Sequence, residues 1–227
     1  MEVSAKEVLM SLFNPEDKVC LRVFADRKDD IYKGSKLSVE CGKFQTIEET
    51  LHQHNAMNRG IFYVVNFGGQ DDSSITRINA QFVEMDHDSF DEQQAKIDVF
   101  PLPPSMVIRT QKSLHTYWFV KDADVLRFRS IQKALVKHFD GDPMCVNESR
   151  VMRLPGFYHC KKDPVMVRCI SFHPERKYTQ DQLSDVLPKV DDEPPEEAKK
   201  GSEKGLDIVL HECRLYTALQ YRCEDTF

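Results

Sequence analysis

Two short apolar segments with a polar turn between them limit what this chain can fold into. Residues 106–110 and 114–120 are rich in β-branched and aromatic side chains, and three polar residues, 111–113, separate them. This pattern is typical of two strands that pair as an antiparallel hairpin. Side chains alternate between the faces of a strand, so three residues share one face of the second strand. These are His115, Tyr117 and Phe119.

The other segments alternate between helix and strand patterns. Apolar spacing or helix-forming residues predict helices over 4–13, 47–57, 90–100 and 124–139, with a short helix after Thr179. Ser4 and Glu7 have the spacing of a capping box, and Thr46 is expected to cap the second helix. Strands are predicted at 18–25, 37–44, 61–65, 79–86 and 165–172. The order indicates an α+β domain that is rich in antiparallel strands.

The chain divides into one large domain and a charged tail. Residues 1–188 carry the helix and strand patterns, which is a normal length for one domain. Residues 189–204 are charged and contain prolines without apolar periodicity, so we expect an acidic linker. Helical spacing returns in 205–227, which predicts the start of a C-terminal helical segment.

Composition narrows the functional class only partly. The chain has no apolar run long enough to cross a bilayer, and its N-terminus lacks a signal-peptide pattern. Its seven cysteines are odd in number and form no CxxC pair, so we expect reduced thiols in a cytoplasmic protein, which for a phage or plasmid gene would mean the cytoplasm of the host cell. The net charge of −6 argues against nucleic-acid binding, but residues 105–177 contain many basic side chains.

Asp86 and Asp88 follow an apolar run and are two residues apart. If both lie on a strand, their carboxylates point in the same direction and repel each other. A divalent cation between them would remove that repulsion. The pair therefore suggests a metal site, although the same pattern also occurs at solvated strand ends.

Other residues can complete such a site. A two-metal centre needs about three carboxylates, and Asp142 or Asp140 can supply the third. His115 can donate to a phosphate oxygen. Several cations are able to hold a triphosphate, although each can equally be a solvated surface charge. They are Lys112, Arg150, Arg153, Lys161 and Lys162.

Taken together, these motifs resemble the archaeo-eukaryotic primase superfamily, and within it the RepB-like primase and primase-polymerase domains of phages and plasmids. The match rests on the strand that ends at residues 85–88, on Ser113-Leu-His115, and on Asp142 ahead of the segment 150–161. The resemblance implies an RRM-like antiparallel catalytic sheet with a second αβ unit. It places the active site in the cleft between the two.

The resemblance also implies residue roles. Asp86, Asp88 and Asp142 would bind Mg²⁺ or Mn²⁺, and Asn147, an amide, favours Asp142 as the third carboxylate. His115 would join them as a catalytic residue. The nucleotide-binding set would be Lys112, Ser113, His115, Arg150, Arg153, His159 and Lys161, with the role of His159 open.

The implied activity is template-dependent nucleotidyl transfer in phage or plasmid replication. The substrates would be NTPs or dNTPs, and the template would be single-stranded DNA. A replicative helicase or a helical domain would be a further partner. Three other hypotheses remain. An RRM-like binding module would need exposed aromatic residues such as Tyr117 and Phe119. A rolling-circle nuclease would use His52-Gln53-His54, and a glycosyltransferase would use the aspartate pair.

Overall fold

The computed structural model describes residues 2–189, which form an antiparallel sheet, a second sheet that is antiparallel except for one short strand, a short ribbon and five α-helices. The first sheet has the strand order β2-β1-β3-β7, and all its neighbours are antiparallel. Its strands are Ser35–Glu40, Lys18–Ala25, Arg59–Val64 and Val151–Arg153. Because β7 comes late in the chain, this sheet joins residues that are far apart in the sequence.

The second sheet is built around β6. One edge of β6 pairs with β4, and the other pairs with β5, beyond which lies β10. These strands are Leu114–Val120, Ala80–Met85, Met106–Arg109 and Arg168–Phe172. β11 (Lys177–Tyr178) adds to the end of β6 in parallel. The ribbon consists of β8 (Tyr158–His159) and β9 (Val165–Met166).

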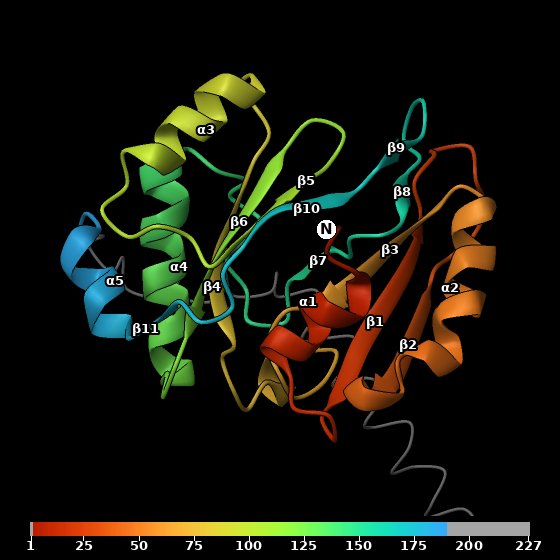
Figure 1. Ribbon diagram of the computed structural model, residues 1–227, viewed down its shortest axis with the longest axis horizontal. Helices are drawn as coiled ribbons and strands as arrows, with labels where there is room; N and C mark the ends of the chain where they lie inside the picture. Colours follow the sequence, from red (N-terminus) through yellow and green to blue (C-terminus); the bar gives the residue numbers. More distant parts are fainter. Residues whose placement is uncertain (1, 190–227) are drawn as a thin grey trace, which may run out of the picture. The chain divides into compact units, whose positions relative to one another are not determined.

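Figure 1 shows the two sheets side by side, with α3, α4 and α5 beside the second sheet and α1 and α2 beside the first. The helices are Ala5–Leu12, Gln45–Ala56, Phe90–Asp98, Val125–Phe139 and Gln180–Val186. Two short 3₁₀ turns, Cys41–Lys43 and Asp72–Ser74, lie in connections. None of the helices in residues 2–189 has the length and apolar character needed to span a bilayer.

The structure confirms the α+β class, the hairpin of β5 and β6, and the Ser4–Glu7 capping box. Three local predictions were wrong. Thr46 does not cap α2, because its hydroxyl donates to the Lys43 carbonyl inside the preceding turn. β2 ends at Glu40, where the chain turns into a 3₁₀ helix, and the strand predicted over 165–172 is interrupted at Val167. The predicted linker and C-terminal helix lie outside the described residues.

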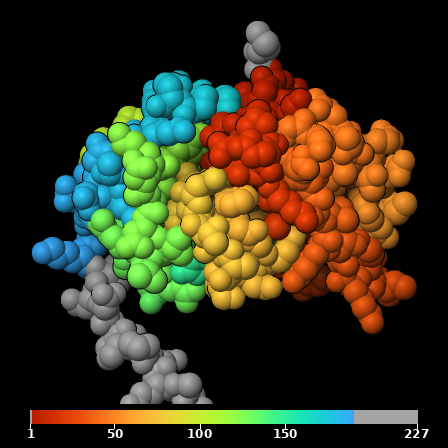
Figure 2. Space-filling view, turned by 90° about the horizontal axis from the view of Figure 1, so that it is seen from below, coloured from red at the N-terminus to blue at the C-terminus, as the bar shows by residue number. Residues whose placement is uncertain are grey.

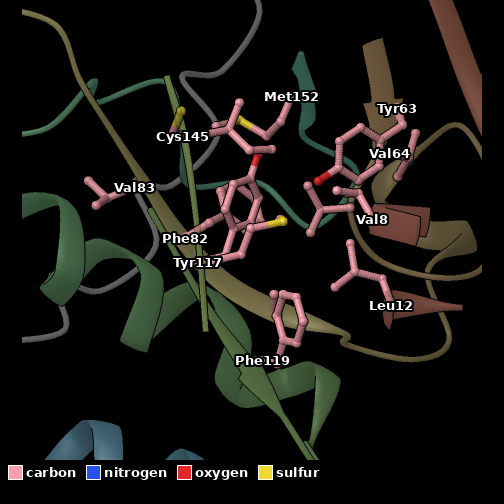
Figure 3. Close-up of a cluster of buried hydrophobic side chains, with 14 of the residues drawn as sticks. Val8, Leu12, Tyr63, Val64, Phe82, Val83, Tyr117, Phe119, Cys145 and Met152 are labelled. Carbon is pink, nitrogen blue, oxygen red and sulfur yellow. The ribbon is translucent and has the colours of Figure 1, made fainter. Parts of the chain in front are cut away.

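One buried cluster joins the sheets. Figure 3 shows side chains from α1, from Tyr63 of β3 and from Tyr117 of β6 within it. Tyr63 and Tyr117 are fully buried, as are Phe82 and Trp118. On the surface seen in Figure 2, the chain around residue 75 lies between the N-terminal part and the part that contains α4. A shared core of this kind fixes the two sheets against each other.

The open edge of β4 is closed by one helix side chain. Gln132 of α4 is fully buried, and its amide donates to the carbonyls of Phe82 and Cys145. Its oxygen accepts from the Phe82 amide at 3.2 Å. Backbone groups at a buried sheet edge must be paired, so Gln132 replaces a neighbouring strand.

We expect Gln132→Leu to lower the free energy of unfolding by about 2–5 kcal/mol, because it leaves buried backbone groups without partners. Urea denaturation followed by circular dichroism measures this change. The matched control is Gln53→Leu, since Gln53 is exposed on α2. Equal losses for the two variants would contradict the role of Gln132.

Candidate active site

A pocket of about 190 Å³ lies between the two sheets. Its lining includes Glu84 and Asp86 from the end of β4 and His115 from β6. The first sheet contributes Phe62 of β3 and all three residues of β7, and His159 and Lys161 come from the β8–β9 ribbon and its turn. Lys112, in the turn between β5 and β6, completes the lining. The pocket thus collects residues that are up to 99 positions apart in the sequence, from Phe62 to Lys161.

Glu84 has the most strongly shifted pKa among the carboxylates of the pocket. Ser113 Oγ donates to its Oε1 at 3.2 Å, and His115 Nε2 lies 3.4 Å from the same oxygen. Burial alone would raise the pKa of Glu84, but His115, Ser113 and Arg150 outweigh burial and lower the pKa to about 2. Glu84 is therefore a fixed negative charge at neutral pH. We did not predict Glu84 from the sequence, although it stands two residues before Asp86 and, like Asp86, lines the pocket.

Asp86 and Asp88 do not share one face of a strand. β4 ends at Met85, so both aspartates follow the strand and its alternation of faces does not relate them. Asp86 lines the pocket and forms an ion pair with Lys112. Asp88 instead pairs with Lys96 of α3 at 2.6 Å and is not part of the pocket lining.

Asp142 lies next to Glu84 because its backbone is attached to β4. The Asp142 amide donates to the Glu84 carbonyl at 2.8 Å. Gly141 permits this approach, since a Cβ there would clash with Val83 and lie 3.0 Å from the Glu84 carbonyl oxygen. Asp140, the alternative third carboxylate, is exposed at the C-cap of α4 in a left-handed conformation. The structure brings Asp142, and not Asp140, to the carboxylate on β4.

The donor set fits a divalent cation. Glu84, Asp142 and Cys145 each offer one ligand atom, and these three atoms lie within 4.8 Å of one another. Burial raises the pKa of Cys145 to about 12, so its thiol stays protonated and is a poor ligand. Oxygen ligands remain, as hard cations such as Mg²⁺ and Mn²⁺ prefer.

The predicted cations fall into two groups. Lys112, Arg153 and Lys161 line the pocket. Arg150 lies outside the lining and pairs with Asp142 at 3.1 Å. Lys162 is exposed and does not line the pocket. Three cations in the lining of a small pocket make it a site for an anion with several charges.

His159 is buried in this cationic wall. Its two ring nitrogens have no hydrogen-bond partner within residues 2–189. Burial lowers the pKa of His159 well below its ordinary value, and nearby Arg153 acts in the same direction. The ring is therefore neutral at pH 7, with a free donor and a free acceptor at the pocket.

Arg153 is held in place by Asp26, which follows β1. The guanidinium donates to both carboxylate oxygens, at 3.2 and 2.6 Å, and both side chains are almost completely buried. The Cys160 amide also donates to Asp26, at 2.7 Å. Gly60 leaves room for the pair, because a Cβ there would lie 2.6 Å from Asp26 and 2.7 Å from Arg153. No local sequence signal indicates Asp26, which is 127 residues from its partner.

Other sequence hypotheses meet specific obstacles. Tyr117 and Phe119 are buried, so they do not form the exposed aromatic face of a binding module. His52 and His54 lie on α2 rather than on a strand, which does not fit a rolling-circle nuclease. Asn147 donates to Asp72 at 3.0 Å and does not line the pocket.

Comparison with known proteins gives the family. Residues 73–184 match the family model of the RepB DNA-primase N-terminal domain. This part of the chain resembles a RepB-type primase domain. The AEP domain of the cyanophage S-2L primase-polymerase is similar to it, with 28% sequence identity and a TM-score of 0.69 over 80% of this chain and 95% of that one. The family model and the phage structure both support a primase-type nucleotidyltransferase domain.

Two further structures share the fold. The primase RepB′ is 13% identical, with a TM-score of 0.59 over 97% of this chain and 69% of that one. The catalytic domain of RepB′ in complex with initiator DNA is 14% identical, with a TM-score of 0.57 over 80% of this chain and 93% of that one. A search of curated proteins finds no match.

We expect Asp26→Asn to lower the free energy of unfolding by about 3 kcal/mol, because it leaves the buried Arg153 without a charge partner. Urea denaturation measures the change. Asp181→Asn is the matched control, since Asp181 pairs with Arg127 on the surface and should cost less than about 1 kcal/mol. Similar losses in both variants would show that the Asp26–Arg153 pair is not a structural anchor.

Proposed function

We propose that this domain transfers nucleotidyl groups on a single-stranded DNA template, and so makes primers and extends them. The supporting observation is that Glu84 and Asp86 share one pocket with Lys112, Arg153 and Lys161. Carboxylates that hold metal ions, next to cations that hold phosphates, are the parts that phosphoryl transfer requires. The primase family and the similarity to a phage primase-polymerase support the same activity.

Glu84, Asp86 and Asp142 are the proposed ligands of Mg²⁺ or Mn²⁺. Bound metal would lower the pKa of an attacking 3′-hydroxyl and offset charge on the leaving pyrophosphate. We assign Glu84 rather than Asp88 to this set, because Glu84 lines the pocket and Asp88 is paired with Lys96. Asp142 keeps the role that the sequence suggested.

The cations are proposed to bind the triphosphate. Lys112 and Arg150 pair with Asp86 and Asp142 in the protein alone. Once another positive charge compensates these carboxylates, both side chains are free to turn toward phosphate oxygens. Arg153 is different, since Asp26 holds it in a fixed position and preorganises one end of the pocket.

His115 and His159 are proposed to donate to the same phosphates. His115 is buried, and its Nε2 faces Glu84 and Ser113, while Nδ1 has no partner within the described part of the chain. The contacts to Glu84 and Ser113 fix the orientation of the ring. His159 is neutral and can present an N–H without adding charge.

The direct test measures incorporation of labelled NTPs and dNTPs on single-stranded DNA, with Mg²⁺ or Mn²⁺ and with or without a primer. Products from unprimed template would establish primer synthesis, and extension of primed template would establish polymerase activity. Added chelator should abolish both. No synthesis under any of these conditions, with DNA binding intact, would favour a non-catalytic binding domain.

The metal assignment predicts which carboxylates matter. Glu84→Gln and Asp86→Asn should each lower the rate of incorporation by more than about 100-fold, because even residues that only support metal ligands typically account for about 10–100-fold. Asp88→Asn is the matched control and should stay within about twofold of wild type, since Asp88 contacts Lys96 instead of the pocket. A large loss of rate in Asp88→Asn, with little effect in Glu84→Gln, would show instead that Asp86 and Asp88 bind the metal.

A further inference from the structure

The pocket is too small for all of the substrates that template-directed synthesis brings together. Its volume of about 190 Å³ is below the ~300–1,000 Å³ of a typical small-molecule site. The proposed function places the phosphates and the reacting atoms in this pocket. The template strand must therefore lie on a surface that adjoins the pocket.

One row of side chains crosses the first sheet and reaches this pocket. The strand register places Arg22 opposite Lys36 on one side and opposite Phe62 on the other, and Phe62 opposite Arg153. Residues directly opposite each other in antiparallel strands lie on the same face. We call Lys36, Arg22, Phe62 and Arg153 the cross-strand row. At about 4.8 Å per strand, the row is about 14 Å long.

The charges of the row are only partly compensated. Arg22 is held by the side-chain and main-chain oxygens of Gln70 and has no acidic partner within residues 2–189. Lys36 reaches Asp71 at 3.7 Å, but the side chains are 58% and 75% exposed, so this pair is weak. Like charges on adjacent strands repel each other, and an anion between Lys36 and Arg22 removes that repulsion.

An aromatic pair lies beside these cations. Phe24 is two residues from Arg22 on β1 and is 37% exposed. Its ring packs edge-on against Phe62, with ring centroids 5.4 Å apart. The guanidinium of Arg153 lies 4.5 Å from the centre of the Phe62 ring. Exposed aromatic rings next to cations are the elements that single-stranded nucleic acid uses, through base stacking and phosphate contacts.

We infer that the cross-strand row and Phe24 bind the single-stranded template next to the nucleotide pocket. Phosphates of the strand lie at Lys36 and Arg22, and its bases stack on Phe24 toward Phe62. Phe62 and Arg153 belong to both surfaces, so the strand is led directly to the reacting atoms. This inference rests on the proposed function, because it identifies the template strand as the occupant.

The charge test compares two double variants by the fluorescence anisotropy of a labelled oligothymidine at several salt concentrations. Arg22→Gln/Lys36→Gln should weaken binding at least about tenfold and reduce the slope of log K against log salt by about 1.4. Arg127→Gln/Lys43→Gln removes the same charge from exposed ion pairs elsewhere and should bind like wild type. Equal affinities for the two double variants would overturn the inference.

The stacking test uses a single aromatic. Phe24→Ala should weaken binding by about fivefold or more, in line with the energy of one base stack. Phe24→Leu keeps an apolar side chain for folding and should lose affinity as well, while Phe24→Tyr should retain it. The matched control is Tyr158→Ala, because Tyr158 is 46% exposed in a separate groove of about 560 Å³ with Arg109 and Arg168. A loss of DNA affinity in Tyr158→Ala, with no loss in Phe24→Ala, would show that the strand binds in that groove and would overturn the inference.

Two measurements separate this inference from the proposed function. Asp86→Asn should keep wild-type DNA affinity, and Arg22→Gln/Lys36→Gln should keep wild-type binding of Mn²⁺–ATP. If the wild type synthesises nothing but Arg22→Gln/Lys36→Gln loses DNA binding, the cross-strand row is a DNA-binding surface and the proposed enzymatic function is wrong. If the wild type synthesises primers but Arg22→Gln/Lys36→Gln binds DNA like its control, the inference about the cross-strand row is wrong and the proposed function is unaffected.

Discussion

The site depends on how the segment after α4 is attached to β4. The Asp142 amide donates to the Glu84 carbonyl, and Gln132 closes the same strand edge two residues earlier, at Phe82. Together these contacts bring two carboxylates from distant parts of the chain into one cluster. Bringing like charges together is unfavourable, and this cost is offset by the backbone hydrogen bonds and by the nearby side chains of Arg150 and His115. Gly141 permits this arrangement, since no larger residue fits against Val83.

Local sequence patterns were sufficient to predict most helices and strands but not all residues of the candidate site. The hairpin, α4 and the capping box at Ser4 depend on residues close in sequence, and the structure has them where the pattern indicates. The choice between Glu84 and Asp88 depends on where β4 ends. An apolar run followed by alternating acids does not reveal that end, which is set by where the pairing with β6 stops, at Met85 and Leu114.

Long-range contacts explain the rest of what the sequence left open. Arg153 was predicted from a motif, but Asp26, which orients it, has no motif of its own and lies just after another strand, β1. Tyr117 and Phe119 alternate as an exposed aromatic face would, yet the first sheet covers them in the shared core. In both cases the deciding fact is which surface packs against which. Pattern analysis of one strand does not contain that information.

The distribution of charge matters more for this chain than its sum. A net charge of −6 alone argues against a nucleic-acid partner. The acidic side chains that face the pocket are compensated by Lys112, Arg150 and His115, whereas Arg22 has no acidic partner in the described chain. Screening limits the reach of exposed charges to about 10 Å at 0.1 M ionic strength, so a strand on the first sheet responds to the nearby row of cations more than to distant acids. An acidic protein can therefore hold a polyanion, provided that cations line the path to its active site.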